Sequence, residues 1–324
     1  MNMDINHMEN LIKTEYSNIT GIIVLKNGEP VYENYFDGFT PEDTVHIMSV
    51  TKSVLSALMG IAIDRGLVRG VGQRVLEFFP DYAVKRGEKT IQQVTIEHLL
   101  TMTAPYKYRS EPYTKVYSSP DWTKSALDLL GGRAGITGEF NYSTVGSQIL
   151  SGILANASGR RVIDFAAENL FGPLGIQTPP NTAVHNKEEH MAFLKAGRVK
   201  GWITDPMGIN TAGWGLCMTP RDMAKIGRLY LNGGVYEGRR VLSASWVQES
   251  TQEKSRWGEL PYGYLWWVME EPGSPSFAAI GDGGNMIYVN PQKHMVAAIA
   301  ARFKPSARIP TELVTDCIVP LFES

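Results

Sequence analysis

Ser49 and Lys52 form the single Ser-x-x-Lys arrangement in the sequence. Residues three apart share one face of a helix, so the lysine amine would lie beside the serine hydroxyl. The apolar run that follows, up to Asp64, predicts a buried helix beginning at Ser49. Apolar surroundings disfavour an ammonium, and a neutral amine can take a proton from a hydroxyl. The pair indicates acyl transfer, although a helix cap beside a surface lysine explains the same residues.

Two later segments could complete such a site. Tyr142 is expected in a loop between helices, where a phenol can relay a proton to a leaving group. A core tyrosine with a bonded hydroxyl is the alternative. Residues 278–285 read AAIGDGGN, and glycines on a strand let a ligand approach the backbone closely. A plain hairpin turn through Asp282 and Gly283 explains that segment equally well.

Composition excludes several other classes of function. The chain has 324 residues, 31 basic against 33 acidic, so no basic excess favours nucleic acid or an anionic membrane. Two cysteines are too few for a disulfide framework. His185 and His190 are five residues apart, which points helical side chains in different directions, so we expect a solvated loop rather than a metal site. No cofactor-binding motif occurs, and no cofactor is expected.

The start of the chain lacks the basic and apolar regions of a secretory signal, and no apolar run is long enough to span a membrane. The expected location is therefore cytoplasmic, unless a leader has been removed. Oligomeric state has no signature in the sequence.

Strand patterns gather at both ends of the chain, with mostly helices and loops between. Thr95 and Thr219 are expected helix caps. The expected elements are a helix at 2–14, strands at 19–25, 31–36, 264–269, 276–280, 285–289 and 294–301, and a last helix at 309–321. This order predicts an α+β fold, with an antiparallel sheet built from N- and C-terminal strands with flanking helices. It also predicts a discontinuous sheet domain (1–66 and 236–324) and an inserted, mostly helical domain (67–235).

The order of the three chemical segments, and four longer stretches, resemble the serine β-lactamase and penicillin-binding-protein-like superfamily. The stretches are TIEHLLTMT (95–103), LFGPLGI (170–176), GLCMTPRDMA (215–224) and YGYLWW (262–267). The resemblance covers nearly the whole chain and is closest to class C β-lactamases, DD-peptidases and family VIII carboxylesterases. Ala279 and the region 202–215 are also similar to 6-aminohexanoate-dimer hydrolases, which are amidases.

The resemblance implies roles for several positions. Ser49 would be the acylated nucleophile, Lys52 its base, and Tyr142 the group that protonates the leaving group and then activates water. The backbone N–H groups of Ser49 and Asp282, the latter following Gly281, would form the oxyanion hole.

Two positions depart from the family pattern. Thr144 stands where class C enzymes have asparagine, and Ala279 where the third motif usually has lysine or histidine. These departures weaken the case for substrates with a carboxylate, unless Arg302 or Arg308 supplies the missing charge.

The expected function is a serine hydrolase acting on small esters or amides through an acyl-enzyme. One alternative is a β-lactamase or a D-Ala-D-Ala carboxypeptidase. The other is a catalytically inactive relative that only binds a ligand.

Overall fold

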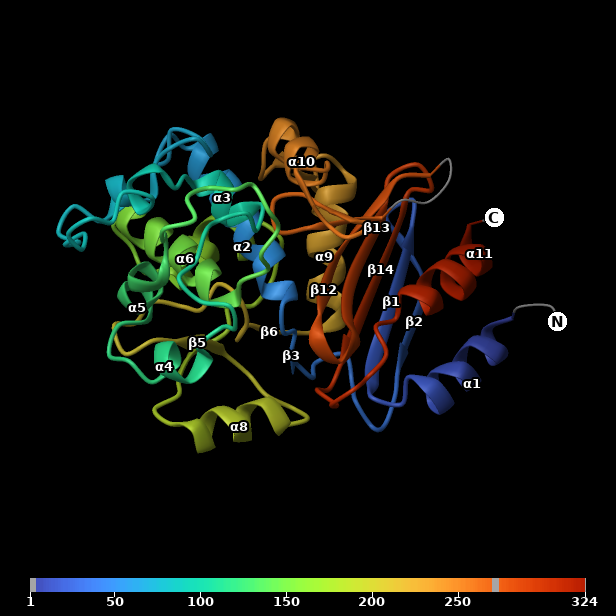
Figure 1. The fold of residues 1–324 in the computed structure, drawn as a ribbon. Coiled ribbons are helices and arrows are strands. Elements are labelled where there is room, and N and C mark those ends of the chain that lie inside the picture. The colour runs from blue at the N-terminus through green and yellow to red at the C-terminus, as the bar shows by residue number, and fades with distance from the viewer. Residues whose placement is uncertain (1–3, 270–273, 324) are drawn as a thin grey trace.

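The computed structural model describes residues 4–269 and 274–323 (Figure 1). Its centre is an antiparallel sheet of eight strands in the order β2-β1-β14-β13-β12-β11-β10-β9. The strands are β2 (Glu29–Tyr35), β1 (Ile19–Lys26), β14 (Met295–Ala301), β13 (Asn285–Asn290), β12 (Ser276–Gly281), β11 (Trp267–Met269), β10 (Leu260–Tyr262) and β9 (Ser255–Trp257). The predicted fold class, a sheet that joins N- and C-terminal strands, is confirmed.

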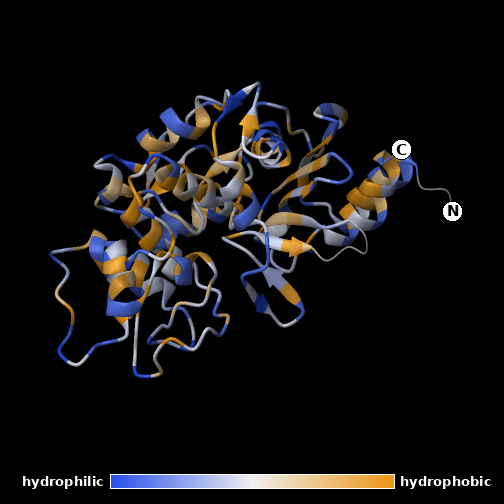
Figure 2. Cartoon of the chain, turned by 90° about the horizontal axis from the view of Figure 1, so that it is seen from above, coloured by the Kyte–Doolittle hydropathy of each residue, from blue (hydrophilic) through white to orange (hydrophobic). Residues whose placement is uncertain are grey.

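Helices cover both faces of the sheet (Figure 1). One face carries α1 (Ile5–Glu15), the π-helical η5 (Leu313–Ile318) and α11 (Val319–Phe322), and the other carries α9 (Pro220–Leu231) and α2 (Val50–Asp64). Near the marked termini, Figure 2 shows apolar and polar residues alternating along the helices, as expected for elements with one buried side.

Small residues bring α9 close to the sheet. A Cβ on Gly227 would lie 2.5 Å from a methyl of Val296 on β14. The seven residues of β14, MVAAIAA, are all buried because helices cover them on both sides.

The region between the terminal strands is mostly helical. Its helices are α3 (Ile96–Leu100), α4 (Tyr113–Tyr117), α5 (Trp122–Leu129), α6 (Thr144–Ser158), α7 (Val162–Ala166), η3 (Ala167–Phe171) and α8 (Lys187–Lys195), with α10 (Ala244–Ser250) following α9. Short 3-10 turns are η1 (Val75–Phe78), η2 (Ile91–Gln93) and η4 (Asp282–Gly284). Short strand pairs are β3 (Val45–His46) with β6 (Cys217–Met218), β4 (Asn181–Ala183) with β5 (Trp202–Thr204), and β7 (Val235–Tyr236) with β8 (Arg239–Arg240).

The buried helix α2 contacts α6 on one side and β12 on the other, so it links the helical region to the sheet. The division into a sheet domain (1–66 and 236–324) and an inserted domain (67–235) remains our proposal. Within those bounds α9 packs against β1, β13 and β14. No helix in the described ranges is long and apolar enough to cross a membrane.

Two predicted elements differ from the structure, and the structure contains one further element that was not expected. The strand expected at 264–269 is shortened to Trp267–Met269, because Leu265 adopts a left-handed conformation (φ 63°) and breaks the ladder. The last helix begins at Thr311 rather than Ile309, and its middle part, Leu313–Ile318, has π-helical geometry. The β9–β10 hairpin was not predicted.

Candidate active site

The N-terminus of α2 brings Ser49 and Lys52 together. Ser49 is the N-cap residue, and Lys52 lies one turn later at a fully buried position, 1% exposed. Its Nζ donates to Ser49 Oγ over 3.0 Å. This burial excludes the alternative of a surface lysine beside a helix cap. A buried amine also needs hydrogen-bond acceptors, because its donors have lost contact with water.

Two further acceptors surround the amine of Lys52. Its Nζ donates to Thr144 Oγ1 over 3.1 Å and to the carbonyl oxygen of Gly213 over 2.8 Å. Three acceptors match the three donors of an ammonium. In a neutral amine, the bonds to Thr144 and Gly213 use both N–H groups and leave the lone pair facing Ser49. We call these four residues the cavity floor.

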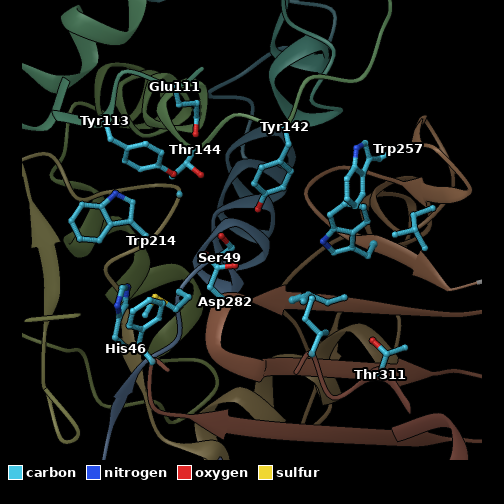
Figure 3. Close-up of a pocket in the computed structure, with 18 of the residues that line it drawn as sticks. His46, Ser49, Glu111, Tyr113, Tyr142, Thr144, Trp214, Trp257, Asp282 and Thr311 are labelled. Carbon is cyan, nitrogen blue, oxygen red and sulfur yellow. The ribbon is translucent and has the colours of Figure 1, made fainter. Parts of the chain in front are cut away.

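Tyr142 lies above the floor. Its ring centroid is 4.8 Å from Lys52 Nζ, and Figure 3 shows its hydroxyl directed toward Ser49. Within the described residues, the Tyr142 hydroxyl makes no hydrogen bond to the protein. A phenol held in place by its ring, with a free hydroxyl, can exchange a proton with a bound molecule.

Glu111 fixes the segment that carries Tyr142 and Thr144. Its carboxylate accepts from Ser143 Oγ over 2.7 Å and from the backbone N–H of Val145 over 2.9 Å. A carboxylate on the first N–H groups of α6 is also favoured by the helix dipole. Sequence reasoning missed Glu111, because nothing in the sequence links it to a segment thirty residues later.

The end of β12 packs directly against the start of α2. A Cβ on Gly281 would lie 2.5 Å from the carbonyl oxygen of Ile47 and 3.2 Å from the backbone nitrogen of Ser49. Only glycine allows this approach. Met48, just before Ser49, has a left-handed backbone (φ 51°). Such strain in a non-glycine residue often marks a functional site.

The Asp282 turn is held by a buried side chain that sequence reasoning also missed. Asn285 donates to the carbonyl oxygens of Asp282 (3.2 Å) and Ala301 (3.1 Å), and it accepts from the N–H of Ala301. These bonds keep the first residue after β12 at the mouth of the cavity. The position of Asn285, directly after the glycine pair, was the available signal in the sequence.

The cavity above the floor has a volume of about 800 Å³. Ser49, Tyr142, Thr144, Gly281 and Asp282 line it, so five of the predicted site residues meet there. Lys52 does not line the cavity itself and is connected to it by the hydrogen bond to Ser49. Ala279 is fully buried in β12 and does not line the cavity.

The charged residues that line the cavity are Glu111 and Asp282, and no lysine or arginine is among its lining residues in the described part of the chain. Arg302 pairs with Asp37 at 2.5 Å, and Arg308 pairs with Glu15 and Glu312. The two arginines considered as substitutes for a cation at position 279 are therefore engaged elsewhere.

His190 differs from the prediction of a solvated loop. It lies on α8 and stacks on Trp214 in the cavity wall, with ring centroids 4.4 Å apart. In the described ranges, no three histidine, cysteine, aspartate or glutamate side chains come together as metal ligands would. The spacing of the two histidines carries no information about Trp214, which lies in a different segment of the chain from His190.

His46 lies in the same wall. Its Nε2 accepts the backbone N–H of Gly215 over 2.7 Å, so its proton is on Nδ1. Burial, with a smaller effect from His190, lowers the pKa of His46 to about 3. The imidazole is therefore neutral at neutral pH and keeps the Gly213–Gly215 loop in place.

Comparisons with known proteins agree with this fold. A family model described as Beta-lactamase matches residues 15–313. The 6-aminohexanoate-dimer hydrolase of Paenarthrobacter ureafaciens is 29% identical, over 85% of this chain and 70% of the relative. Beta-lactamase-like protein 4 of Dictyostelium discoideum is 21% identical over 90% of this chain, which spans only 56% of that protein.

Solved structures share the fold. A putative β-lactamase from Bacteroides dorei has a TM-score of 0.76 at 18% identity and covers 100% of both chains. An octameric penicillin-binding protein homologue from Pyrococcus abyssi has a TM-score of 0.75 at 21% identity, over 98% of this chain and 77% of that one. Since the family model spans most of the chain, the protein belongs to the beta-lactamase family and is a hydrolase of the serine β-lactamase superfamily.

Proposed function

We propose that the protein hydrolyses small uncharged esters and linear amides through an acyl-enzyme formed on Ser49. The observation that carries this proposal is the 3.0 Å contact between Lys52 Nζ and Ser49 Oγ at a buried position. In the neutral amine, Thr144 and Gly213 accept both N–H groups, which leaves the lone pair of the nitrogen facing Ser49 and free for the serine proton.

In the acylation step, Ser49 Oγ attacks the acyl carbon and Lys52 takes the hydroxyl proton. The negative charge that develops on the carbonyl oxygen is stabilised by the backbone N–H groups of Ser49 and Asp282. One such donor is worth about 3–4 kcal/mol in other acyl-transfer enzymes. Tyr142 gives its proton to the leaving oxygen or nitrogen as the acyl–heteroatom bond breaks, and Lys52 returns a proton to Tyr142.

In the second step, water attacks the ester on Ser49. Tyr142 takes a proton from this water as it passes its own proton to the neutral amine of Lys52, and Lys52 gives that proton to Ser49 Oγ as the bond to the acyl group breaks and the acid is released. The reaction consumes one water and needs no cofactor.

The charges of the cavity support an uncharged substrate. With Glu111 and Asp282 as its lining charges, a bound carboxylate would meet repulsion rather than a cation. One opposite charge about 4 Å away is worth up to about 4 kcal/mol at an effective dielectric of 20. Losing half of that interaction lowers kcat/KM more than tenfold. The name of the Paenarthrobacter relative supports cleavage of a linear amide bond, although a 6-aminohexanoate dimer carries a carboxylate, so the preference for an uncharged substrate rests on the charges of the cavity alone.

The second candidate is β-lactam hydrolysis, which the family description favours. We expect kcat/KM for p-nitrophenyl acetate, or for a small linear amide, to exceed that for a chromogenic cephalosporin by far. Efficient hydrolysis of the cephalosporin by the wild type would reverse this order and favour the β-lactamase alternative.

The nucleophile is tested by labelling with a fluorophosphonate, followed by mapping of the labelled peptide. We expect the label on Ser49 alone, and we expect Ser49→Ala to abolish both labelling and turnover with an unchanged melting temperature. A label on another serine, with Ser49 free, would contradict the proposed function. Absence of any label or turnover would favour the inactive binding relative.

A further inference from the structure

The β9–β10 hairpin presents two large apolar side chains at the mouth of the cavity. Trp257 and Leu260 are directly opposite each other across the turn, where Gly258 has a φ of 57°. Cross-strand partners point to the same face of a hairpin, so both side chains face the cavity, which they line. Trp257 is 60% exposed and Leu260 47% exposed.

A third exposed residue, Ile309, lines the same cavity and is 50% exposed. We call Trp257, Leu260 and Ile309 the rim. Large apolar side chains that gather at one opening mark a binding surface more often than scattered ones do.

An aromatic wall connects the rim to Tyr142. The rings of Trp257 and Trp267 are 6.3 Å apart in an edge-to-face arrangement, and those of Trp267 and Tyr142 are 6.1 Å apart and nearly parallel, at 15°. Figure 3 shows Trp257 beside Tyr142 on one side of the cavity, opposite Trp214. The aromatic wall therefore runs from Tyr142, whose hydroxyl faces Ser49, through Trp267 to the exposed ring of Trp257.

Resting on the proposed function, we propose that this wall binds an aromatic leaving group, so that the preferred substrates are aryl esters or aryl amides. Tyr142 gives its proton to the leaving atom, so the group attached to that atom lies next to Tyr142, where the wall begins. A flat aromatic group there can stack on Trp267 and Trp257. Cleavage releases it as a phenol or arylamine carrying the proton from Tyr142, while the acyl group stays on Ser49.

The test compares three esters. In 2-naphthyl acetate the leaving group is aromatic. In hexafluoroisopropyl acetate it is an alcohol of similar acidity without a ring, and in hexafluoroisopropyl 2-naphthoate the ring is on the acyl side. We expect Trp257→Ala to lower the ratio of kcat/KM for 2-naphthyl acetate over hexafluoroisopropyl acetate about tenfold.

Met207→Ala is the matched control, because Met207 is 65% exposed and does not line this cavity. We expect it to leave the ratio as in the wild type. An equal loss for all three esters in Trp257→Ala, or a selective loss for the naphthoate, would overturn the assignment to the leaving group.

A binding measurement separates this inference from the proposed function. Calorimetry with 2-naphthol needs no turnover, so it is done with Ser49→Ala and with Ser49→Ala/Trp257→Ala. We expect about tenfold weaker binding to the double variant. Equal binding would refute the aromatic wall whatever Ser49 does, whereas full activity of Ser49→Ala would refute the proposed function and leave the wall intact.

Discussion

Polar side chains at the cavity floor are buried and hydrogen-bonded, whereas the side chains at the rim are apolar and exposed. Lys52 has three oxygen acceptors, and each acceptor belongs to a different segment of the chain. Among the described residues, Trp257 has one aromatic neighbour, Trp267, and its side chain is largely exposed. The contrast suggests that the floor determines whether any acyl group is transferred, and the rim which leaving group is preferred.

The largest effect is expected for Lys52→Arg. A guanidinium keeps the positive charge but cannot take the serine proton, so kcat should fall by more than about 10⁴, as when one member of a catalytic unit is removed. Steady-state kinetics on p-nitrophenyl acetate measure this change. Lys225→Arg, on α9 and paired with Asp222, is the control and should behave as wild type. Wild-type turnover in Lys52→Arg would show that Lys52 has only a structural role in the cavity floor.

Tyr142→Phe removes one oxygen and little volume. If the hydroxyl transfers a proton, kcat should fall by about 10²–10⁴ for every ester, aryl or alkyl alike. The melting temperature should stay close to that of the wild type, because the hydroxyl has no protein partner among the described residues. Kinetics equal to wild type would return Tyr142 to the role of a wall aromatic.

Gly281→Ala tests the contact between β12 and α2. A Cβ there would lie 2.5 Å from the carbonyl oxygen of Ile47, so the start of α2 must move. A shift of about 1 Å in a reacting group can cost up to about 10²-fold in rate. We expect a ten- to hundredfold lower kcat/KM for both aryl and alkyl esters. Gly72→Ala is the control, because nothing lies within 4 Å of its Cβ. A change confined to aryl esters would contradict the division between floor and rim.

The last prediction concerns stability rather than turnover, and it comes from His46. Its pKa is lowered to about 3 in the folded protein, against about 6.5 when unfolded. Between these values the unfolded state binds the extra proton, so stability falls as the pH drops below 6.5, by about 1.4 kcal/mol per pH unit for one group. His46→Gln keeps an acceptor for Gly215 but has no such titration. Urea unfolding between pH 7 and 4 should show a smaller loss in this variant; an identical loss would assign the slope to other groups.

Local patterns predicted much of the fold. The strands expected at 19–25 and 31–36 correspond to β1 and β2, Thr95 and Thr219 cap α3 and α9, and the apolar run after Ser49 forms α2. These features depend on residues close in sequence, so the sequence alone was sufficient.

The site was less predictable, because it depends on distant backbone groups. No sequence pattern indicates that the carbonyl oxygen of Gly213 accepts from Lys52. No pattern indicates either that the hydroxyl of Ser143 donates a hydrogen bond to Glu111. The hairpin that carries Trp257 could have been found from Gly258 between two short polar–apolar runs. Its position beside Tyr142 follows only from the order of strands in the sheet.

The pairing of β1 with β14 has a consequence for protein synthesis. Ile19 pairs with Ala301, so β1 is synthesised long before the strand with which it pairs. Ser49 and Lys52 leave the ribosome early, but the β12 backbone beside Ser49 is added only after residue 275. Pairings so distant in sequence form slowly. The nascent chain should therefore stay without hydrolytic activity, and with the edge of β1 unpaired, until the last strands emerge.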